Sequence, residues 1–250
     1  MRLLVLSDIH SNLEALEACL AAAPAVGGVA NLGDIVGYGA SPNAVLDRVR
    51  PLGDIFVRGN HDRACGNDTP IEDFNAPAAF VAMWTRQQLT PENRQWLREL
   101  PAGPLTDANW PDVQFVHGSP LDEDQYVINE PSAHFALEPA PFPLTFFGHT
   151  HVQGGFAMRR MSVARIEIER PDSTLTGSRV KLLPGVKYMI NPGSVGQPRD
   201  EDPRAAFAVL DTEEHSIVFH RVTYDVEKAQ QRILAAGLPP RFAIRLSEGR

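Results

Sequence analysis

The 250-residue sequence has few cysteines and no long hydrophobic run. Its two cysteines, Cys19 and Cys65, are too few for a disulfide framework and form no C-x-x-C pair, so a reducing compartment is expected. No apolar stretch approaches the ~20 residues of a transmembrane helix, and the run Leu3–Leu6 is too short for the core of a signal peptide. We therefore expect a cytoplasmic protein with no membrane partner.

The sequence also lacks an excess of basic residues. Its 31 acidic residues outnumber 23 basic ones, for a formal net charge of −8. An acidic surface repels the phosphates of duplex nucleic acid, so we expect no duplex nucleic acid partner. Hydrophobic residues make up 43% of the chain, which is enough for the core of one domain over residues 1–250.

Short apolar runs alternate with helical patterns in the first part of the chain. Leu3–Leu6, Val29–Leu32 and Ile55–Val57 are predicted strands, and residues 13–23 and 42–50 are predicted helices. This alternation indicates a layered α/β fold. Further strands are predicted at residues 113–116, 144–147, 163–168, 186–190, 205–210 and 216–222, and a further helix at residues 225–236.

Residues 75–100 depart from this alternation. They predict two helices, over residues 75–89 and 92–100. The pair is either a helical insertion that covers a functional site or an ordinary peripheral element. The polar stretch Pro171–Arg179 is typical of a surface loop.

Five segments of the chain share one design, in which a short apolar run is followed at once by metal-ligand side chains. They are Asp8-Ile9-His10, Gly33-Asp34, Gly59-Asn60-His61-Asp62, His117-Gly118 and Gly148-His149-Thr150-His151. Because ligands of open α/β sheets bind beyond the carboxyl ends of strands, we expect these loops to converge.

Five of the eight histidines lie in these segments. Taken singly, each polar residue has an ordinary explanation, such as a helix N-cap for Asp8 or a turn at Asn60. Taken together, they need five separate explanations. Imidazole and carboxylate suit transition metals, and the number of candidate ligands indicates two ions that share a bridging carboxylate.

Three other residues are candidates for binding substrate phosphate. Ser194 lies in the loop Asn191–Gly196, which either lines the site or forms a plain turn. Arg63 and Arg199 are candidate phosphate contacts because guanidinium binds phosphate through two hydrogen bonds. The alternative for both arginines is a solvated surface position.

These segments resemble the motifs of the calcineurin-like metallophosphoesterase superfamily. The match runs through D-x-H at Asp8 to His10, G-D-x-V-x-Y-G at Gly33 to Gly39, G-N-H-D at Gly59 to Asp62, H-G at His117-Gly118 and G-H-T-H at Gly148 to His151. It covers the chain from Met1 to about Arg199 and is most similar to the small prokaryotic phosphodiesterase branch. The fold that this resemblance implies is a β-sandwich flanked by helices.

The resemblance also implies a role for each matching residue. Asp8, His10 and His151 would bind one metal ion, Asn60, His117 and His149 would bind a second, and Asp34 would bridge both. His61 would lie beside the leaving group and be oriented by Asp62. Members of the family use Mn, Fe, Zn, Ni or Co.

The implied activity is hydrolysis of a small phosphate ester, possibly a nucleotide and more specifically a phosphodiester, by direct attack of a metal-bridging hydroxide. His61 as imidazolium would protonate the leaving oxygen. A phosphomonoesterase, a protein phosphatase and a dinucleoside-polyphosphate hydrolase remain alternatives with the same centre. A non-enzymatic scaffold on this fold is a further alternative, although such a protein is expected to lose ligands that are all present here.

Overall fold

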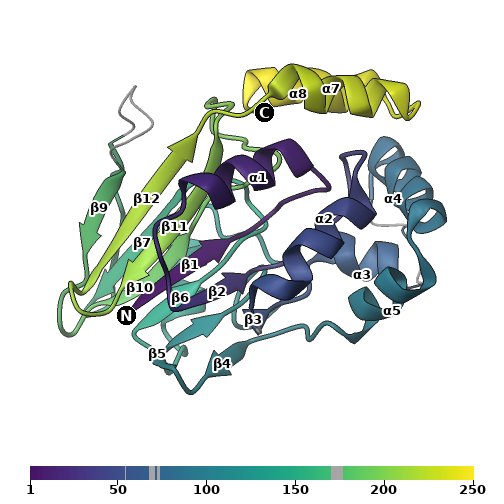
Figure 1. The fold of residues 1–250 in the computed structure, drawn as a ribbon. Coiled ribbons are helices and arrows are strands. Elements are labelled where there is room, and N and C mark those ends of the chain that lie inside the picture. Colours follow the sequence, from purple (N-terminus) through teal and green to yellow (C-terminus); the bar gives the residue numbers. More distant parts are fainter. Residues whose placement is uncertain (54, 68–70, 72–73, 170–176) are drawn as a thin grey trace.

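Two sheets pack face to face in the computed structural model of the chain (Figure 1). It describes residues 1–53, 55–67, 71, 74–169 and 177–250. Within these residues, each sheet has six strands, in the orders β3-β2-β1-β11-β12-β9 and β4-β5-β6-β10-β7-β8. The predicted sandwich flanked by helices is therefore confirmed.

The first sheet joins a parallel N-terminal part to an antiparallel C-terminal part. Its strands are β1 (Arg2–Leu6), β2 (Gly28–Asn31), β3 (Ile55–Phe56), β9 (Ser178–Lys181), β11 (Ala205–Asp211) and β12 (Ser216–Val222). β1 pairs with β2 and β2 with β3 in parallel, whereas β1 pairs with β11 in antiparallel fashion. The carboxyl ends of β1, β2 and β3 therefore meet at one edge.

The second sheet has the same design. Its strands are β4 (Leu105–Asp107), β5 (Trp110–Phe115), β6 (Leu144–Phe146), β7 (Gly154–Arg159), β8 (Ser162–Arg165) and β10 (Lys187–Asn191). β6 lies in parallel between β5 and β10, and β7 and β8 continue the sheet as antiparallel strands. The carboxyl ends of its three parallel strands also meet at one edge.

Alternation along β1 explains why its residues form an unbroken apolar run. Leu3 and Val5 face the core between the sheets, where they join Phe115 and Phe146 of the second sheet. Leu4 and Leu6 face the opposite core under the helices. A strand that is buried on both faces needs apolar side chains at every position.

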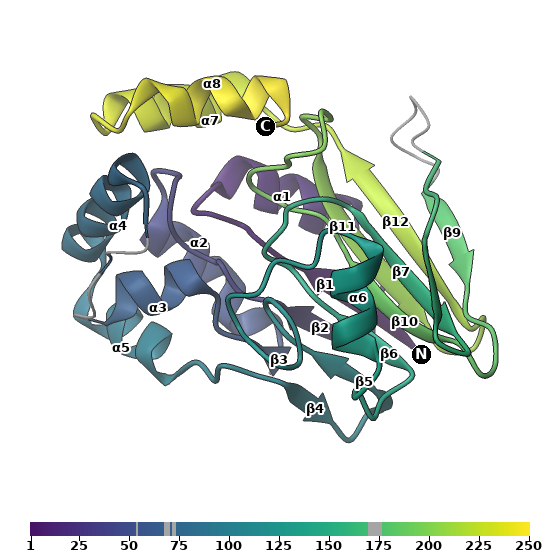
Figure 2. The same ribbon diagram turned by 180° about the vertical axis from the view of Figure 1, so that it is seen from behind.

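Helices cover the outer faces of both sheets. They are α1 (Leu13–Ala22), α2 (Pro42–Val49), the 3-10 helix η1 (Arg50–Leu52), α3 (Asn60–Gly66), α4 (Ala76–Gln88), α5 (Pro91–Glu99), α6 (Glu130–Leu137), α7 (Val226–Ala235) and α8 (Pro240–Glu248). α1 and α2 cover the first sheet, and α6 covers the second, which is visible from behind in Figure 2. α7 and α8 form a C-terminal hairpin that packs against α4.

Some predicted boundaries are wrong. The strand predicted over residues 163–168 ends at Arg165, and residues 178–179, predicted as loop, belong to β9. Residues 171–176 of that predicted loop lie outside the described residues. The sequence did not predict the strands β4, β7 and β9 or the helices η1, α3, α6 and α8. Among the described residues, no helix has the length and apolar character needed to span a membrane.

The two helices predicted within residues 75–100 exist as α4 and α5 and have different surroundings. Asn75 and Ala78, at the start of α4, line a cavity described below. α5 packs instead on the core under the first sheet through Leu97.

Candidate metal centre

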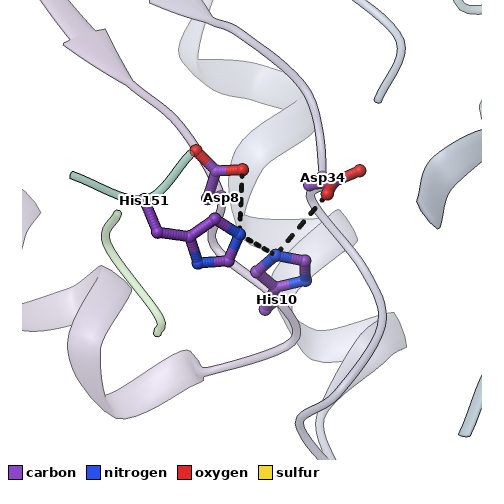
Figure 3. A group of neighbouring side chains, drawn as sticks. All are labelled: Asp8, His10, Asp34 and His151. Carbon is purple, nitrogen blue, oxygen red and sulfur yellow. Dashed lines mark hydrogen bonds and ion pairs between the residues drawn. The ribbon is translucent and has the colours of Figure 1, made fainter. Parts of the chain in front are cut away.

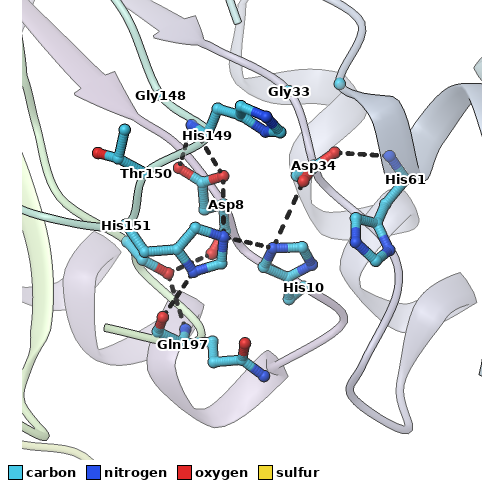
Figure 4. Close-up of polar contacts among 12 residues, drawn as sticks. Asp8, His10, Gly33, Asp34, His61, Gly148, His149, Thr150, His151 and Gln197 are labelled. Atoms are coloured by element: carbon cyan, nitrogen blue, oxygen red, sulfur yellow. Dashed lines mark hydrogen bonds and ion pairs between the residues drawn. The ribbon is translucent and has the colours of Figure 1, made fainter. Parts of the chain in front are cut away.

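The two parallel strand sets bring the sequence motifs together at one edge of the sandwich. Asp8 and His10 follow β1, Asp34 follows β2 and Asn60 follows β3. From the second sheet, His117 follows β5, and His149 and His151 follow β6. Figure 4 shows that side chains from both sheets point toward one another. The convergence expected from the sequence is thus present in the structure.

Five of these residues have left-handed backbone conformations. The φ angles of Asp8, His10, Asp34, His149 and His151 lie between 48° and 66°. Non-glycine residues rarely adopt this region, and such residues cluster at functional sites where the surrounding structure holds them. The close approach of the Gly59 backbone to Asp34 also excludes a side chain at position 59, because a Cβ there would lie 2.1 Å from Asp34 Oδ1. The backbone here is shaped by the site rather than by local propensity.

One cluster of ligand-type atoms is formed by Asp8, His10, Asp34 and His151 (Figure 3). These atoms all lie within 4.8 Å of one another, and all four residues are buried. His151 Nε2 lies 3.4 Å from Asp8 Oδ1, and His10 Nε2 lies 3.6 Å from Asp34 Oδ2. The two Nε2 atoms of His10 and His151 are 3.1 Å apart.

A second cluster is formed by Asp34, His117 and His149, again within 4.8 Å. His117 Nε2 lies 3.5 Å from Asp34 Oδ2 and 3.1 Å from His149 Nδ1. Asn60 Oδ1 lies 3.3 Å from His117 Nε2, which adds an amide oxygen to this cluster. Asp34 belongs to both clusters, as expected for a bridging ligand.

Each of the four histidines is anchored through its other ring nitrogen to a backbone carbonyl. The contacts are His10 Nδ1 to Val36 O at 3.1 Å, His151 Nδ1 to Gln197 O at 2.6 Å, His117 Nδ1 to Leu32 O at 2.7 Å and His149 Nε2 to Asp124 O at 3.1 Å. A carbonyl only accepts, so these nitrogens carry the protons. Burial lowers the pKa of His10 and of His151 well below the usual range, so in these neutral rings the two Nε2 lone pairs face each other at 3.1 Å. In the second pair, His117 Nε2 lies 3.1 Å from His149 Nδ1, and a proton on His117 occupies the place between them in the metal-free chain.

Such facing lone pairs repel unless a cation lies between or beside them. Anchoring of the outward N–H to a carbonyl is the usual arrangement around metal-ligating histidine. The donor set therefore fits a transition metal ion at each cluster. No ion is part of the structure.

The pKa shifts of the clustered residues in the metal-free chain also indicate a site for positive charge. Burial raises the pKa of Asp8 to about 7. Burial lowers the pKa of His117, but the Asp34 carboxylate more than offsets it and raises this pKa to about 10. Burial, and then the charge of Arg199, lower the pKa of His151 well below its usual range. A proton on His117 thus supplies positive charge beside the buried carboxyl groups of Asp34 and Asp8.

His61 lies beside the two clusters without belonging to either. Its ring centroid is 4.4 Å from that of Tyr38, 4.8 Å from Phe74 and 5.0 Å from His10. Its backbone N–H donates to Asp34 Oδ1 at 2.8 Å. Burial lowers the pKa of His61 to about 4, which favours the neutral ring over the expected imidazolium in the metal-free chain. A neutral imidazole remains able to donate one hydrogen bond.

Asp62 does not have the expected role of orienting His61. Its Oδ1 accepts the N–H groups of Ile35 and Val36 at 2.9 and 3.1 Å, and its Oδ2 accepts that of Gly59 at 3.1 Å. These bonds fix the loop after Asp34 and the start of α3. Asp62 therefore positions the backbone around Asp34, and the buried Nδ1 of His61 has no hydrogen-bond partner among the described residues.

Ser194 also has a different role from the one predicted. It is fully buried, its hydroxyl donates to Asp8 O at 2.7 Å, and it accepts the N–H of Gln197 at 2.8 Å. The hydroxyl thus both donates and accepts a hydrogen bond within the protein, and Ser194 connects its loop to the backbone of Asp8. This arrangement does not offer the hydroxyl to a substrate.

A cavity of about 360 Å³ opens beside the clusters. His61, His149 and His151 are among its lining residues, as are both predicted arginines, Arg63 and Arg199. Sequence reasoning missed its aromatic lining, which is formed by Tyr38, Phe74 and Tyr126. Only Tyr38 had a signal in the sequence, as part of the G-D-x-V-x-Y-G motif.

Comparisons with known proteins agree with this geometry. The family model described as calcineurin-like phosphoesterase superfamily domain matches residues 1–215. An uncharacterised protein of Methanocaldococcus jannaschii is 34% identical over 249 residues, which cover 98% of this chain and 97% of that protein.

Two solved structures are similar over the whole chain. A metallophosphoesterase from Sphaerobacter thermophilus has a TM-score of 0.86 and 38% identity, with 100% of this chain and 99% of that chain covered. A hypothetical protein from Pyrococcus horikoshii has a TM-score of 0.80 and 20% identity, with 100% and 98% covered, and shows the same fold.

Proposed function

This chain belongs to the calcineurin-like phosphoesterase superfamily, and we propose that it is a two-metal enzyme that hydrolyses small phosphodiesters. The observation that carries the proposal is the pair of facing histidine nitrogens at each cluster, with every outward nitrogen held by a carbonyl. Two bound transition metal ions would activate a water and neutralise charge on the phosphoryl group. The intact ligand set argues against a scaffold that has lost catalysis.

We assign the candidate residues to metal binding and to contact with the substrate. Asp8, His10 and His151 would hold one ion, Asn60, His117 and His149 the other, and Asp34 would be shared. His61 lines the cavity and, as a neutral imidazole, donates a hydrogen bond to the leaving oxygen. The aromatic walls restrict water around the reacting group.

The cavity favours a diester over a monoester. Its volume of about 360 Å³ leaves room for a second ester group beside the phosphorus. Of its two lining arginines, Arg63 is already paired with Glu123 and Asp124. One available guanidinium suits a monoanionic diester better than a dianionic monoester.

The test compares bis(p-nitrophenyl) phosphate with p-nitrophenyl phosphate, using purified protein loaded with Mn. We expect faster turnover of the diester. Turnover of the monoester alone would contradict the diester assignment but leave a phosphoesterase. Because a contaminating phosphatase is indifferent to a change in this chain, loss of turnover in His61→Gln assigns the activity to this site.

A further inference from the structure

Two arginines line the cavity, and their surroundings differ sharply. Arg63 is bound on both arms, since Nη1 pairs with Glu123 and Nη2 pairs with Asp124 at 2.7 Å. Glu123 also pairs with Arg58 at 3.0 Å. Arg63 therefore connects α3 to the loop whose Asp124 carbonyl accepts the N–H of His149. Its charge is compensated within the protein.

Arg199 differs from Arg63 in its partners. Among the residues that the structure describes, it forms no salt bridge with a carboxylate, and its buried Nε has no hydrogen-bond partner. Its Nη2 donates to Gln197 Oε1 at 3.0 Å, and its guanidinium also forms a hydrogen bond with the side chain of Tyr38. A half-buried guanidinium with an unused donor is costly unless an anion completes it.

The side chain of Arg199 is nevertheless held in place. Its guanidinium carbon lies 5.7 Å from the ring centroid of Tyr38, and that ring lies 5.0 Å from Phe242 of α8. The backbone N–H of Arg199 donates to His151 O at 3.2 Å. Asp200, the next residue, forms a buried ion pair with Arg221. α8 lies outside residues 1–215, so an element beyond the family match supports this side chain.

We propose that Arg199 binds the substrate by donating hydrogen bonds to a phosphoryl oxygen of the ester. Arg63 instead has a structural role and does not contact the substrate. The assignment rests on the proposed function for the identity of the anion. Arg199 is tied to the metal-ligand loop through Gln197, whose carbonyl accepts the N–H of His151. Gln197 thus connects the proposed anion site to the cluster that contains His151.

The test measures binding of inorganic phosphate to Mn-loaded protein by isothermal titration. The variants are Arg199→Met, Arg199→Lys and Arg63→Met, each with its metal content measured. Arg63→Met removes the same unit charge from the same cavity, so it controls for long-range attraction. We expect Arg199→Met to weaken phosphate binding roughly 10- to 100-fold at unchanged metal content, as for loss of charge-assisted hydrogen bonds. Arg199→Lys should recover part of the loss, and Arg63→Met should stay within about twofold.

Equal phosphate binding by Arg199→Met and the wild type would overturn the assignment. So would an equal loss in Arg63→Met at full metal content. Failure of the proposed function has a different signature, namely wild-type protein that binds phosphate through Arg199 but hydrolyses neither chromogenic ester.

Discussion

Replacement of Asp34 by asparagine removes the carboxylate that both clusters share. Asp34 Oδ2 lies 3.6 Å from His10 Nε2 and 3.5 Å from His117 Nε2, so it serves both sides. At an effective dielectric constant of about 20, a unit charge about 4 Å from a singly charged partner contributes roughly 4 kcal/mol. We expect Asp34→Asn to weaken metal binding by at least about 100-fold, after allowance for the amide oxygen that remains.

The assay is elemental analysis of Mn-loaded protein after removal of free metal. His61→Gln is the matched control, because this variant keeps the backbone N–H that donates to Asp34 and removes no side chain from either cluster. We expect two ions per chain in the wild type and in His61→Gln, and fewer in Asp34→Asn. Two retained ions in Asp34→Asn, or an equal loss in His61→Gln, would refute the reasoning.

Three further predictions concern activity, pH and stability. Gly37→Ala places a Cβ about 2.5 Å from His61 Nδ1 at a φ of +94°, so we expect turnover of the diester to fall at least about 10-fold while elemental analysis still gives wild-type metal content. Burial lowers the pKa of His61 from 6.5 to about 4, so the folded metal-free protein binds fewer protons than the unfolded chain between these values and loses stability as pH falls through that window. Urea titrations at pH 7 and pH 4 should show a loss up to about 3 kcal/mol larger in the wild type than in His61→Gln, and identical losses would contradict this pKa. Leu16→Ala empties a fully buried position of α1 and should cost about 2–5 kcal/mol of unfolding free energy in urea, whereas a loss below about 1 kcal/mol would show that the core under the first sheet collapses around it.

The sequence predicted that the candidate ligand residues converge, because the signal of each motif is local. Each motif follows a buried strand, and parallel strands in a sandwich end at a common edge, so Asp8, Asp34 and His117 had to come close. The strands that were missed lack that signal. β7 begins with Gly154 and Gly155, both at positive φ, and its pattern does not resemble a regular strand.

Side-chain roles beyond the ligands were less predictable, because they depend on contacts between distant segments. Ser194 and Asp62 look like site residues in sequence, yet their hydrogen bonds run to the backbones of Asp8 and Ile35. The difference between Arg63 and Arg199 depends on whether a carboxylate from another loop reaches the guanidinium. No spacing rule along the chain carries that information.

The central claim is that two metal ions bind at the two clusters. Crystals of Mn-loaded protein, measured by anomalous diffraction at the manganese absorption edge, test it most directly. We expect two anomalous peaks, one among Asp8, His10, Asp34 and His151 and the other among Asp34, Asn60, His117 and His149. A single peak, or peaks away from Asp34 in fully loaded protein, would contradict the account.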